Sequence, residues 1–598
     1  MRLRRVLAVT PVIGLLGGVP VVQGADTLSV YPTAGTQTAS PTTQISFRGA
    51  ATAPAASVLV SGSATGPHSG TVENHSDGNG FSFIPDQSFQ PGETVSVQVM
   101  GYDLVGEQNG SVSFQIYTPV PHLKLVPNPD AGGTAKKSQH FHSEPHLLPP
   151  FLVVMTKKGG TAPGDLFTAP KISRGQDGAM ITNKRGQLIW FHPAPKGTSI
   201  YDFRVQHLGG QPVLTWWQGK TLFAKGYGKG VIYDTTYRKI GQVTGANGYK
   251  PDLHEFELGP DGTAYTTNYQ PVMYDVSSIT GTPGQMGKLF DCVIQGIDIK
   301  TGLVKFEWHS LDHIPLTDSY FRFIASAVDP FDPVHLNSVE PEPNGNLLLS
   351  GRNTSAAYEI DPSSGNILWR LGGKSSDFSM GPRASFVAQH DVRRRPDGDI
   401  TVFDNGTPPQ SPSQKPRPAR GIQLHLDMNA HTATLVHKFK RRQKTFAASQ
   451  GNVETLPNGN VFVGWGGSSP YMSEFKSDGS LVFDARFDPG GSTIGTDTNS
   501  YRAYKLPWSA RPYFPPKLAL ESVGGGKLEV YLSWNGATDV AKWEVLAGSS
   551  PSTLKSVKRF HHNGFESSTR IPSSYKYVAA RARASDGSVL GTTQTVKR

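Results

Sequence analysis

The sequence contains a single cysteine, Cys292, among its 598 residues. No intrachain disulfide can form, so hydrophobic cores must hold the domains together even if the chain is secreted. Free cysteine is among the residue types most often buried as a small apolar side chain. We therefore interpret Cys292 as a core residue rather than as a nucleophile.

Long apolar runs are also scarce. The one candidate, Val6 to Val22, follows a basic start at Arg2 to Arg5 and is interrupted by prolines and glycines. A basic start, a short apolar stretch and a small residue near Gly24 together predict a signal peptide over residues 1–25 rather than a membrane anchor. The sequence thus predicts a secreted protein, extracellular, periplasmic or on the cell surface, with no stable membrane span.

Charged residues make up only 17% of the chain, with a net charge of +10. No recognised nucleic-acid-binding module is present, so nucleic acid is not an expected partner. The basic clusters Arg393–Arg395 and Lys438–Lys444 are typical of solvated surfaces. A positive field would also gather anionic small molecules at a cleft.

Glycine and proline are abundant, at 66 and 46 residues. Many turns between short strands have this composition, whereas helical bundles do not. Aromatic residues make up 10% of the chain, which argues against disorder. The length exceeds what one hydrophobic core can organise, so we expect several all-β domains.

Both flanks of the chain show alternating strands separated by turns. Residues 26–118 predict an N-terminal β-sandwich, followed by a linker rich in proline, histidine and lysine at 119–150. Residues 515–598 predict a second sandwich of the fibronectin type III-like or Ig-like kind, with prolines at its start.

The middle of the chain, residues 151–510, is repetitive. A turn of Asp-Gly, Asn-Gly or Gly-Gly type recurs six times, and a second turn followed by an apolar strand also occurs six times. Six copies of each element predict a six-bladed β-propeller, because closing the ring removes exposed strand edges. The longest interval between turns, from Gly262 to Gly345, predicts a loop or short helix near Leu311 to Pro330 over one mouth of the ring.

Three of the repeats carry a histidine shortly before the turn, and a fourth carries Gln450 at the equivalent place. The histidines are His254, His335 and His390. Equivalent positions of successive blades lie at the same height around the axis, so we expect these side chains to converge at one mouth. The alternative is that each histidine only caps a turn or bonds a neighbouring blade.

Asn337 lies two residues after His335, and Arg352 lies at the end of the strand that follows this histidine. Neutral imidazole is a nucleophile, and the guanidinium fork suits a tetrahedral oxyanion. This set favours transfer of an anionic group over sugar hydrolysis, which uses a pair of carboxylates. Three histidines could instead hold zinc, although a cation beside the metal is costly.

At these residues the sequence resembles the arylsulfotransferase (arylsulfate sulfotransferase) family, in its secreted fungal/actinobacterial-like branch. The resemblance covers residues 140 to 510. The stretches that carry it are Gly164–Pro170, His254–Phe256, His335–Val339, Gln389–Arg393, Phe403–Gly406, Gly451–Asn460 and Tyr501–Tyr504.

The resemblance implies a six-bladed propeller that transfers a sulfuryl group from an aryl sulfate donor to a phenolic acceptor. It implies no nucleotide sulfate donor, no cofactor and no metal, and its partners are small phenols. Its nucleophile, which becomes a sulfohistidine, corresponds to His390. The residues that hold the sulfate correspond to His254, His335, Asn337 and Arg352, and a family threonine corresponds to Thr455.

Two other functions remain open from the residues. The chain could be a non-catalytic propeller that binds a surface polymer or glycan, with the sandwiches as surface-binding modules, or a metal-dependent hydrolase with histidine ligands. Four Asn-X-Ser/Thr sequons, which matter only in a glycosylating host, begin at Asn74, Asn109, Asn353 and Asn405.

Overall fold

The computed structural model describes residues 26–50, 52–123, 138–173, 175–222, 224–325, 328–407, 415–467, 471–488 and 498–598. The predicted signal peptide, residues 1–25, and residues 124–137 of the predicted linker lie outside these residues. Within them the fold is nearly all β, as expected, and is built from many sheets whose strand pairs are mostly antiparallel. Its helices are short: α1 (Ser277–Thr280), α2 (Ser310–His313) and the 3-10 turns η1 (Ala55–Ser57), η3 (Leu316–Asp318) and η4 (Pro551–Thr553).

Two sheets form the N-terminal part. The first has the order β5 (Gly70–Asn74), β6 (Gly80–Pro85), β2 (Ile45–Arg48), β1 (Asp26–Tyr31) and β8 (Tyr102–Leu104). The second has the order β4 (Gly66–His68), β3 (Val58–Gly62), β7 (Thr94–Val99) and β9 (Val112–Gln115). Alternate side chains of both sheets share one buried core, which contains Phe47, Phe81 and Phe114.

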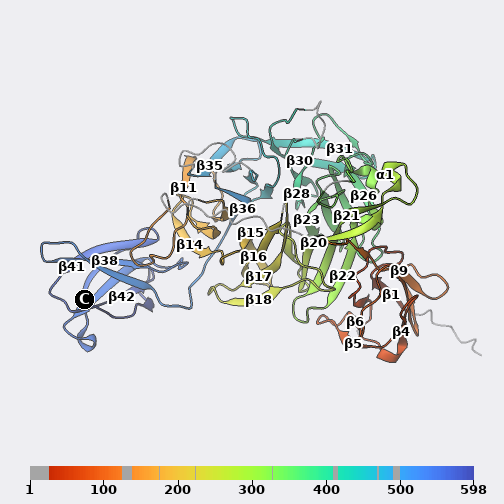
Figure 1. Ribbon diagram of the computed structural model, residues 1–598. Coiled ribbons are helices and arrows are strands. Elements are labelled where there is room, and N and C mark those ends of the chain that lie inside the picture. The colour runs from red at the N-terminus through yellow and green to blue at the C-terminus, as the bar shows by residue number, and fades with distance from the viewer. Residues whose placement is uncertain are drawn as a thin grey trace, which may run out of the picture.

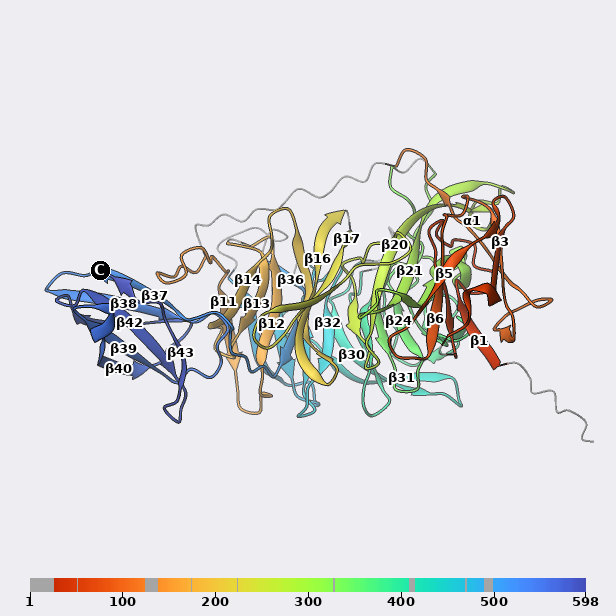
Figure 2. The same cartoon turned by 90° about the horizontal axis from the view of Figure 1, so that it is seen from below.

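Two further sheets form the C-terminal part. One has the order β37 (Lys517–Ser522), β38 (Lys527–Ser533) and β41 (Glu566–Pro572). The other has the order β40 (Lys555–His561), β39 (Lys542–Gly548), β42 (Tyr577–Arg583) and β43 (Val589–Thr592), with β44 (Val596–Lys597) also on β42. The N-terminal and C-terminal sheets lie at opposite ends of the molecule, on either side of the central part (Figures 1 and 2).

Six sheets form the central part of the described chain. Each sheet is given from its innermost strand outward. The first has the order β36 (Asn499–Leu506), β12 (Asp165–Lys171), β13 (Gly178–Thr182) and β14 (Leu188–Pro193), and the second has the order β15 (Ser199–Leu208), β16 (Gln211–Leu222), β17 (Lys225–Tyr233) and β18 (Lys239–Val243). The third has the order β19 (Phe256–Leu258), β20 (Thr263–Asp275), β21 (Met286–Asp298) and β22 (Val304–His309), with β10 (Thr118–Pro119) also paired with β20.

The fourth sheet has the order β23 (Leu336–Pro341), β24 (Leu347–Gly351), β25 (Ala356–Ile360) and β26 (Ile367–Gly372). The fifth has the order β28 (His390–Arg394), β29 (Ile400–Asp404), β30 (Arg420–Asp427), β31 (Thr432–Phe439) and β27 (Ser379–Met380). The sixth has the order β32 (Asn452–Thr455), β33 (Val461–Gly464), β34 (Tyr471–Phe475), β35 (Leu481–Phe487) and β11 (Leu152–Lys157).

The six central sheets close on themselves. The inner strands pack in the order β15, β19 with β20, β23, β28, β32 and β36, and β36 packs back on β15. Two pairings between the ends of this region fasten the ring, because β12 pairs with β36 and β11 pairs with β35. The arrangement is propeller-like, and it brings the inner strand of every sheet to the central axis.

The predicted turns lie where strands of one sheet reverse. Five of the six Gly-containing turns join the inner strand to the second strand, as at Asp261-Gly262 and Asp397-Gly398. The sixth, Asp177-Gly178, instead joins β12 to β13, because the inner strand of that sheet is β36 from the far end of the region. The second set of turns precedes the fourth strand from the axis in all six sheets, for example at Ser364-Gly365.

The basic cluster Arg393–Arg395 is not a solvated surface, so that interpretation was wrong. Arg393 bonds Glu255 at 2.6 Å, and Arg394 bonds Glu342 at 2.6 Å. Both guanidinium groups reach from β28 to carboxylates of other sheets, and charge pairing lowers the cost of burying them. Cys292 is free and buried, as expected.

Candidate functional site

A cavity of about 550 Å³ opens at one mouth of the ring. Every central sheet contributes a side chain from the start of its inner strand or from the residues just before it. These six residues are Tyr201, His254, His335, His390, Gln450 and Tyr501. The three predicted histidines and Gln450 therefore do converge, as the repeat positions predicted, and two tyrosines complete the circle.

Several residues at this mouth have left-handed backbone conformations. The φ angles are 53° at Asp202, 56° at His335, 55° at Asp391 and 67° at Gln450. Such conformations are uncommon outside glycine and cost roughly 1–3 kcal/mol each. The strain recurs in four sheets, at the cavity residue itself for His335 and Gln450 and at the residue that follows it for Asp202 and Asp391.

His254 and His335 each bind a carboxylate through Nδ1. His254 pairs with Asp252, and His335 Nδ1 lies 2.6 Å from Asp332 Oδ2. The two imidazole rings are perpendicular, with centroids 4.8 Å apart. A carboxylate on Nδ1 fixes ring orientation and leaves Nε2 for chemistry.

Lys225, the first residue of β17, is a further cation in the cavity wall. Its Nζ lies 2.8 Å from Asp332 Oδ2, the oxygen that also binds His335. The ammonium also lies 5.0 Å from the ring centroid of Tyr269 and 4.4 Å from that of Phe290. One carboxylate thus joins a lysine and a histidine inside the cavity.

His390 is oriented by a neutral partner instead. Its Nδ1 lies 2.8 Å from Oδ1 of Asn405, and its Nε2 accepts the backbone N–H of Gln450 at 3.0 Å. This geometry places the proton on Nδ1 and the lone pair on Nε2. Asn405 is buried and also donates from Nδ2 to the carbonyl of Gln450 at 3.0 Å.

Arg352 lines the same cavity. Its Nη1 donates to Asn353 Oδ1 at 2.8 Å, and its Nη2 lies 3.3 Å from the carbonyl of Ala448. Asn353 is itself anchored, because its Nδ2 donates to the carbonyl of Asp332 at 2.7 Å. Among the described residues no carboxylate forms an ion pair with Arg352, so its charge is available to an anion in the cavity.

The protonation of the cavity follows from burial and charge. Burial and the nearby Arg352 guanidinium hold the pKa of His390 well below its usual value near 6.5. Burial likewise lowers the pKa of His335 to about 4, against the opposing effect of Asp332. Burial also lowers the pKa of Arg352. The imidazoles of His390 and His335 are therefore neutral at pH 7, which suits His390 to act as a nucleophile.

The structure places the other two predicted binding residues outside the described cavity wall. Asn337 is buried, and its Nδ2 donates to the carbonyl of Gln389 at 2.8 Å. It therefore supports the backbone that presents His390. Thr455, at the end of β32, accepts Nη1 of Arg395 at 2.9 Å, on the side of the ring away from the mouth.

A buried ionic network closes the axis beneath the cavity. Arg502 Nη1 lies 3.0 Å from both Asp202 Oδ1 and Glu255 Oε1, and its Nη2 donates to the carbonyl of Asn337 at 2.7 Å. Glu255 also binds Arg204 at 2.8 Å. Because Asp391 accepts the backbone N–H of Val453 and binds Arg393, the network spans all six sheets. Four of the mouth residues, Tyr201, His254, His390 and Tyr501, directly precede a charged member of this network.

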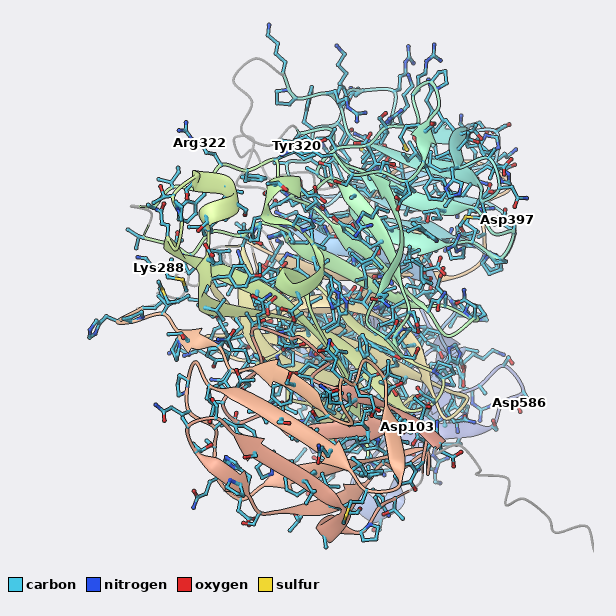
Figure 3. All side chains as sticks on the ribbon, turned by 90° about the vertical axis from the view of Figure 1, so that its right-hand side faces the viewer. Asp103, Lys288, Tyr320, Arg322, Asp397 and Asp586 are labelled. Carbon is cyan, nitrogen blue, oxygen red and sulfur yellow. The ribbon has the colours of Figure 1, made fainter. Side chains whose placement is uncertain are left out.

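The segment after η3 covers part of the mouth. Phe321, Arg322, Ile324 and Phe331 line the cavity, which agrees with the loop predicted over one mouth near Leu311 to Pro330. Figure 3 shows Arg322 on the opposite side of the ring from Asp397, which lies in the turn between β28 and β29. The cavity and the Asp-Gly turns therefore lie at opposite faces.

Within the described ranges, no three His, Cys, Asp or Glu side chains are grouped as metal ligands. The same ranges contain no helix long and apolar enough to cross a membrane. The cavity is lined by three imidazoles, by the guanidinium groups of Arg322 and Arg352, by the ammonium of Lys225, by the carboxylates of Asp329 and Asp332, and by aromatic rings.

Sequence reasoning missed several members of this set. Tyr201 and Tyr501 could have been found. Each is followed by a charged residue, Asp202 or Arg502, and stands in its repeat where His254-Glu255 and His390-Asp391 stand in theirs. Asp252 and Asp332 stand two and three residues before their histidines, a local signal that could have predicted the pairs. Lys225 has no such signal, because it reaches the site from the third strand of a neighbouring sheet.

The comparisons with known proteins bear on this region. Residues 204–488 match the family model described as Arylsulfotransferase (ASST), which includes all three histidines and Arg352. The match supports the arylsulfotransferase family for this part of the chain. No curated protein matches the sequence.

Solved structures with distant similarity include an auxiliary nutrient binding protein from Bacteroides ovatus, 12% identical over 85% of this chain and 95% of that chain, with a TM-score of 0.28. Virginiamycin B lyase from Staphylococcus aureus is 10% identical over 56% of this chain and 87% of that chain, with a TM-score of 0.27. A protein of unknown function from Bacteroides caccae is 14% identical over 59% and 98%, with a TM-score of 0.33. These similarities are too low to bear on function.

Proposed function

We propose that the protein is an aryl sulfate sulfotransferase, which moves a sulfuryl group from an aryl sulfate to a phenol without a nucleotide donor or a cofactor. The observation that carries the proposal is the meeting of His390, His254, His335 and Arg352 in one cavity, within the residues that match the arylsulfotransferase model. We also propose that the chain is of the secreted fungal/actinobacterial-like branch and that the ring is a six-bladed β-propeller between two β-sandwiches.

The first half-reaction forms a sulfohistidine. The Nε2 lone pair of His390 bonds to sulfur as the bond from sulfur to the aryl oxygen breaks, and the departing phenolate takes a proton from an imidazole beside it. In the second half-reaction a phenol gives up its proton to that imidazole, its oxygen bonds to sulfur, and the lone pair returns to His390. Splitting one exchange into two steps gives ping-pong kinetics.

Charge supports this assignment of roles. A transferring sulfuryl group, like a phosphoryl group, is stabilised mainly by position and by cations on its oxygens. Arg352 faces the cavity with no carboxylate partner in the described chain, and its fork can hold two of these oxygens. Asn405 orients His390 without adding charge that would protonate it.

Aromatic and apolar side chains support an aryl substrate. Tyr201, Tyr501, Phe321, Phe331 and Leu253 line the cavity beside the histidines. Such walls stack on a phenol ring while the cations hold its sulfate.

The test is incubation of the purified protein with a chromogenic aryl sulfate, with and without a phenol acceptor. We expect a burst of phenol, then steady turnover only with acceptor, and loss of both in a folded His390→Ala variant. Release of free sulfate that requires a bound metal would instead favour a hydrolase. Binding of a glycan or polymer without any phenol release would favour a non-catalytic propeller.

We further propose export of the chain, supported by the basic, apolar and small-residue pattern of residues 1–25. N-terminal sequencing of the exported protein tests this: a start near Ala25 is expected, and retention inside the cell contradicts it. Surface binding by the N-terminal and C-terminal sheets is a separate proposal, tested by cell-surface pull-down with and without residues 515–598.

A further inference from the structure

The two Asp–His pairs of the cavity differ in how their carboxylates are compensated. Asp332 Oδ2 binds His335 and also Lys225 Nζ at 2.8 Å. Asp252 binds His254 and receives backbone N–H groups of His254 at 3.0 Å and Gly226 at 2.5 Å. Among the described residues no lysine or arginine forms an ion pair with Asp252. One pair therefore contains a cation and the other does not.

Lys225 is held firmly in this position. The residue is only 8% exposed, and its ammonium lies between Asp332 and the rings of Tyr269 and Phe290. Charges act on one another more strongly in such a site than in water. The ammonium consequently cancels much of the field that Asp332 would otherwise exert on His335.

The two imidazoles are too close to be charged together. Their centroids are 4.8 Å apart, and like charges at this distance disfavour double protonation. The other groups that face His335 are Tyr269, with its ring centroid 5.6 Å away, and across the cavity His390 and Arg352. Asp329 also lines the cavity, but among the described residues Asp332 is the one carboxylate that bonds His335. The 4.8 Å separation of the two rings therefore limits the pair to one proton.

We propose that Lys225 is a positioning residue that compensates Asp332, keeps His335 neutral and so assigns the shared proton to His254. The inference rests on the proposed sulfuryl transfer and names the proton carrier of its two half-reactions. His254 gives its proton to the departing phenolate oxygen as the bond from sulfur to oxygen breaks. It takes the proton of the acceptor phenol as the bond from nitrogen to sulfur breaks. The lowered pKa of His335, about 4, agrees with this division.

A titration tests the role of Lys225 without turnover. The full chain, labelled with ¹³C at histidine, is titrated by NMR, and His335→Gln identifies the His335 signal. Lys225→Met, or Lys225→Gln if the first variant does not fold, should raise the pKa of His335 from about 4 toward or above the ordinary value of about 6.5. Lys225→Arg keeps the cation and should leave it low. An unchanged titration in the Met and Gln variants would overturn the proposal.

A series of aryl sulfates with different leaving-group acidity tests His254. In His254→Gln the loss of phenol release should grow as the phenol becomes less acidic, toward the roughly 10²–10⁴-fold contribution of a general acid. In His335→Gln the loss should be the same for all donors, and Lys225→Met should move toward the His254→Gln pattern. If phenol release by His254→Gln depends on the acidity of the leaving phenol as it does in the wild type, His254 is not the proton donor. If the wild type releases no phenol from any donor, the proposed function fails, whereas the titration still decides the role of Lys225.

Discussion

Asn405 and His390 are joined by a 2.8 Å hydrogen bond from Nδ1 of the imidazole to Oδ1 of the amide. The other side of the amide donates to the carbonyl of Gln450, whose N–H in turn caps Nε2 of His390 at 3.0 Å. The three residues form a closed cycle that fixes the tautomer. The N–H of Gln450 must leave Nε2 before this atom attacks sulfur, and it is then free to bind a sulfuryl oxygen.

The first prediction follows from the neutrality of Asn405. In Asn405→Asp a carboxylate faces Nδ1, which favours the imidazolium and raises the pKa of His390 from its lowered value. Since attack needs the neutral ring, the acid limb of kcat/KM should move to higher pH, and activity near pH 6 should fall most. The measurement is a pH profile of phenol release. A profile that keeps the position of the wild type would show that Asn405 does not set the protonation of His390.

The second prediction concerns Arg352. Arg352→Lys keeps the charge but loses the planar fork, so kcat/KM for aryl sulfates should fall by about 10²–10³-fold, as for loss of one oxyanion donor. Arg442→Lys, on an exposed side chain, is the matched control and should keep full activity. Equal activity of both variants would make Arg352 a structural residue.

The third prediction concerns the ionic network of the axis. Arg502→Met removes the buried guanidinium that joins Glu255 to Asp202 and leaves two carboxylates to share the remaining arginines, so the free energy of unfolding should drop by about 3–5 kcal/mol. Arg511→Met breaks an exposed pair with Asp539 and should cost at most about 1 kcal/mol. Chemical denaturation of the two variants provides the comparison. Similar losses would mean that the network does not hold the ring together.

The fourth prediction concerns the segment over the mouth. Ile324 lines the cavity and is 54% exposed, so it can cover an incoming phenol. Ile324→Ser should raise KM for phenolic acceptors several-fold and leave the burst with donor alone unchanged. Ile240→Ser, with a similarly exposed side chain on β18, is the control. If KM for acceptors stays the same, the acceptor binds elsewhere.

Much of the central fold could be predicted, because Gly turns and apolar strands are local signals that recur with the sheets. Closure by β11 and β12 could not, since it pairs strands more than 300 residues apart in the sequence, such as Leu152 with Phe487. The cluster Arg393–Arg395 misled for the same reason. Its acidic partners Glu255 and Glu342 lie in other sheets, so the local sequence alone gives no sign that these arginines are paired.

The site was predictable where it repeats and not where it depends on packing. His254, His335 and His390 follow the repeat, and Arg352 lies near one of them. Asn405 looked like a glycosylation sequon but is buried against His390, and Asn353 is buried as well, so only the exposed Asn74 and Asn109 remain as candidate sites of glycosylation. Asn337 was selected by its place in the sequence beside His335 and Thr455 by resemblance, and neither specifies which way a side chain faces.

The central claim is that His390 carries the sulfuryl group. The direct measurement is the mass of the protein after a short exposure to aryl sulfate without acceptor and an alkaline quench, followed by peptide mapping. An adduct on nitrogen should survive in alkali and be lost in acid, since protonation makes the ring a better leaving group. We predict one added sulfuryl group on the peptide that contains His390, removed when a phenol is added. An adduct on another residue, or rapid donor turnover with no adduct under any quench, would contradict the account.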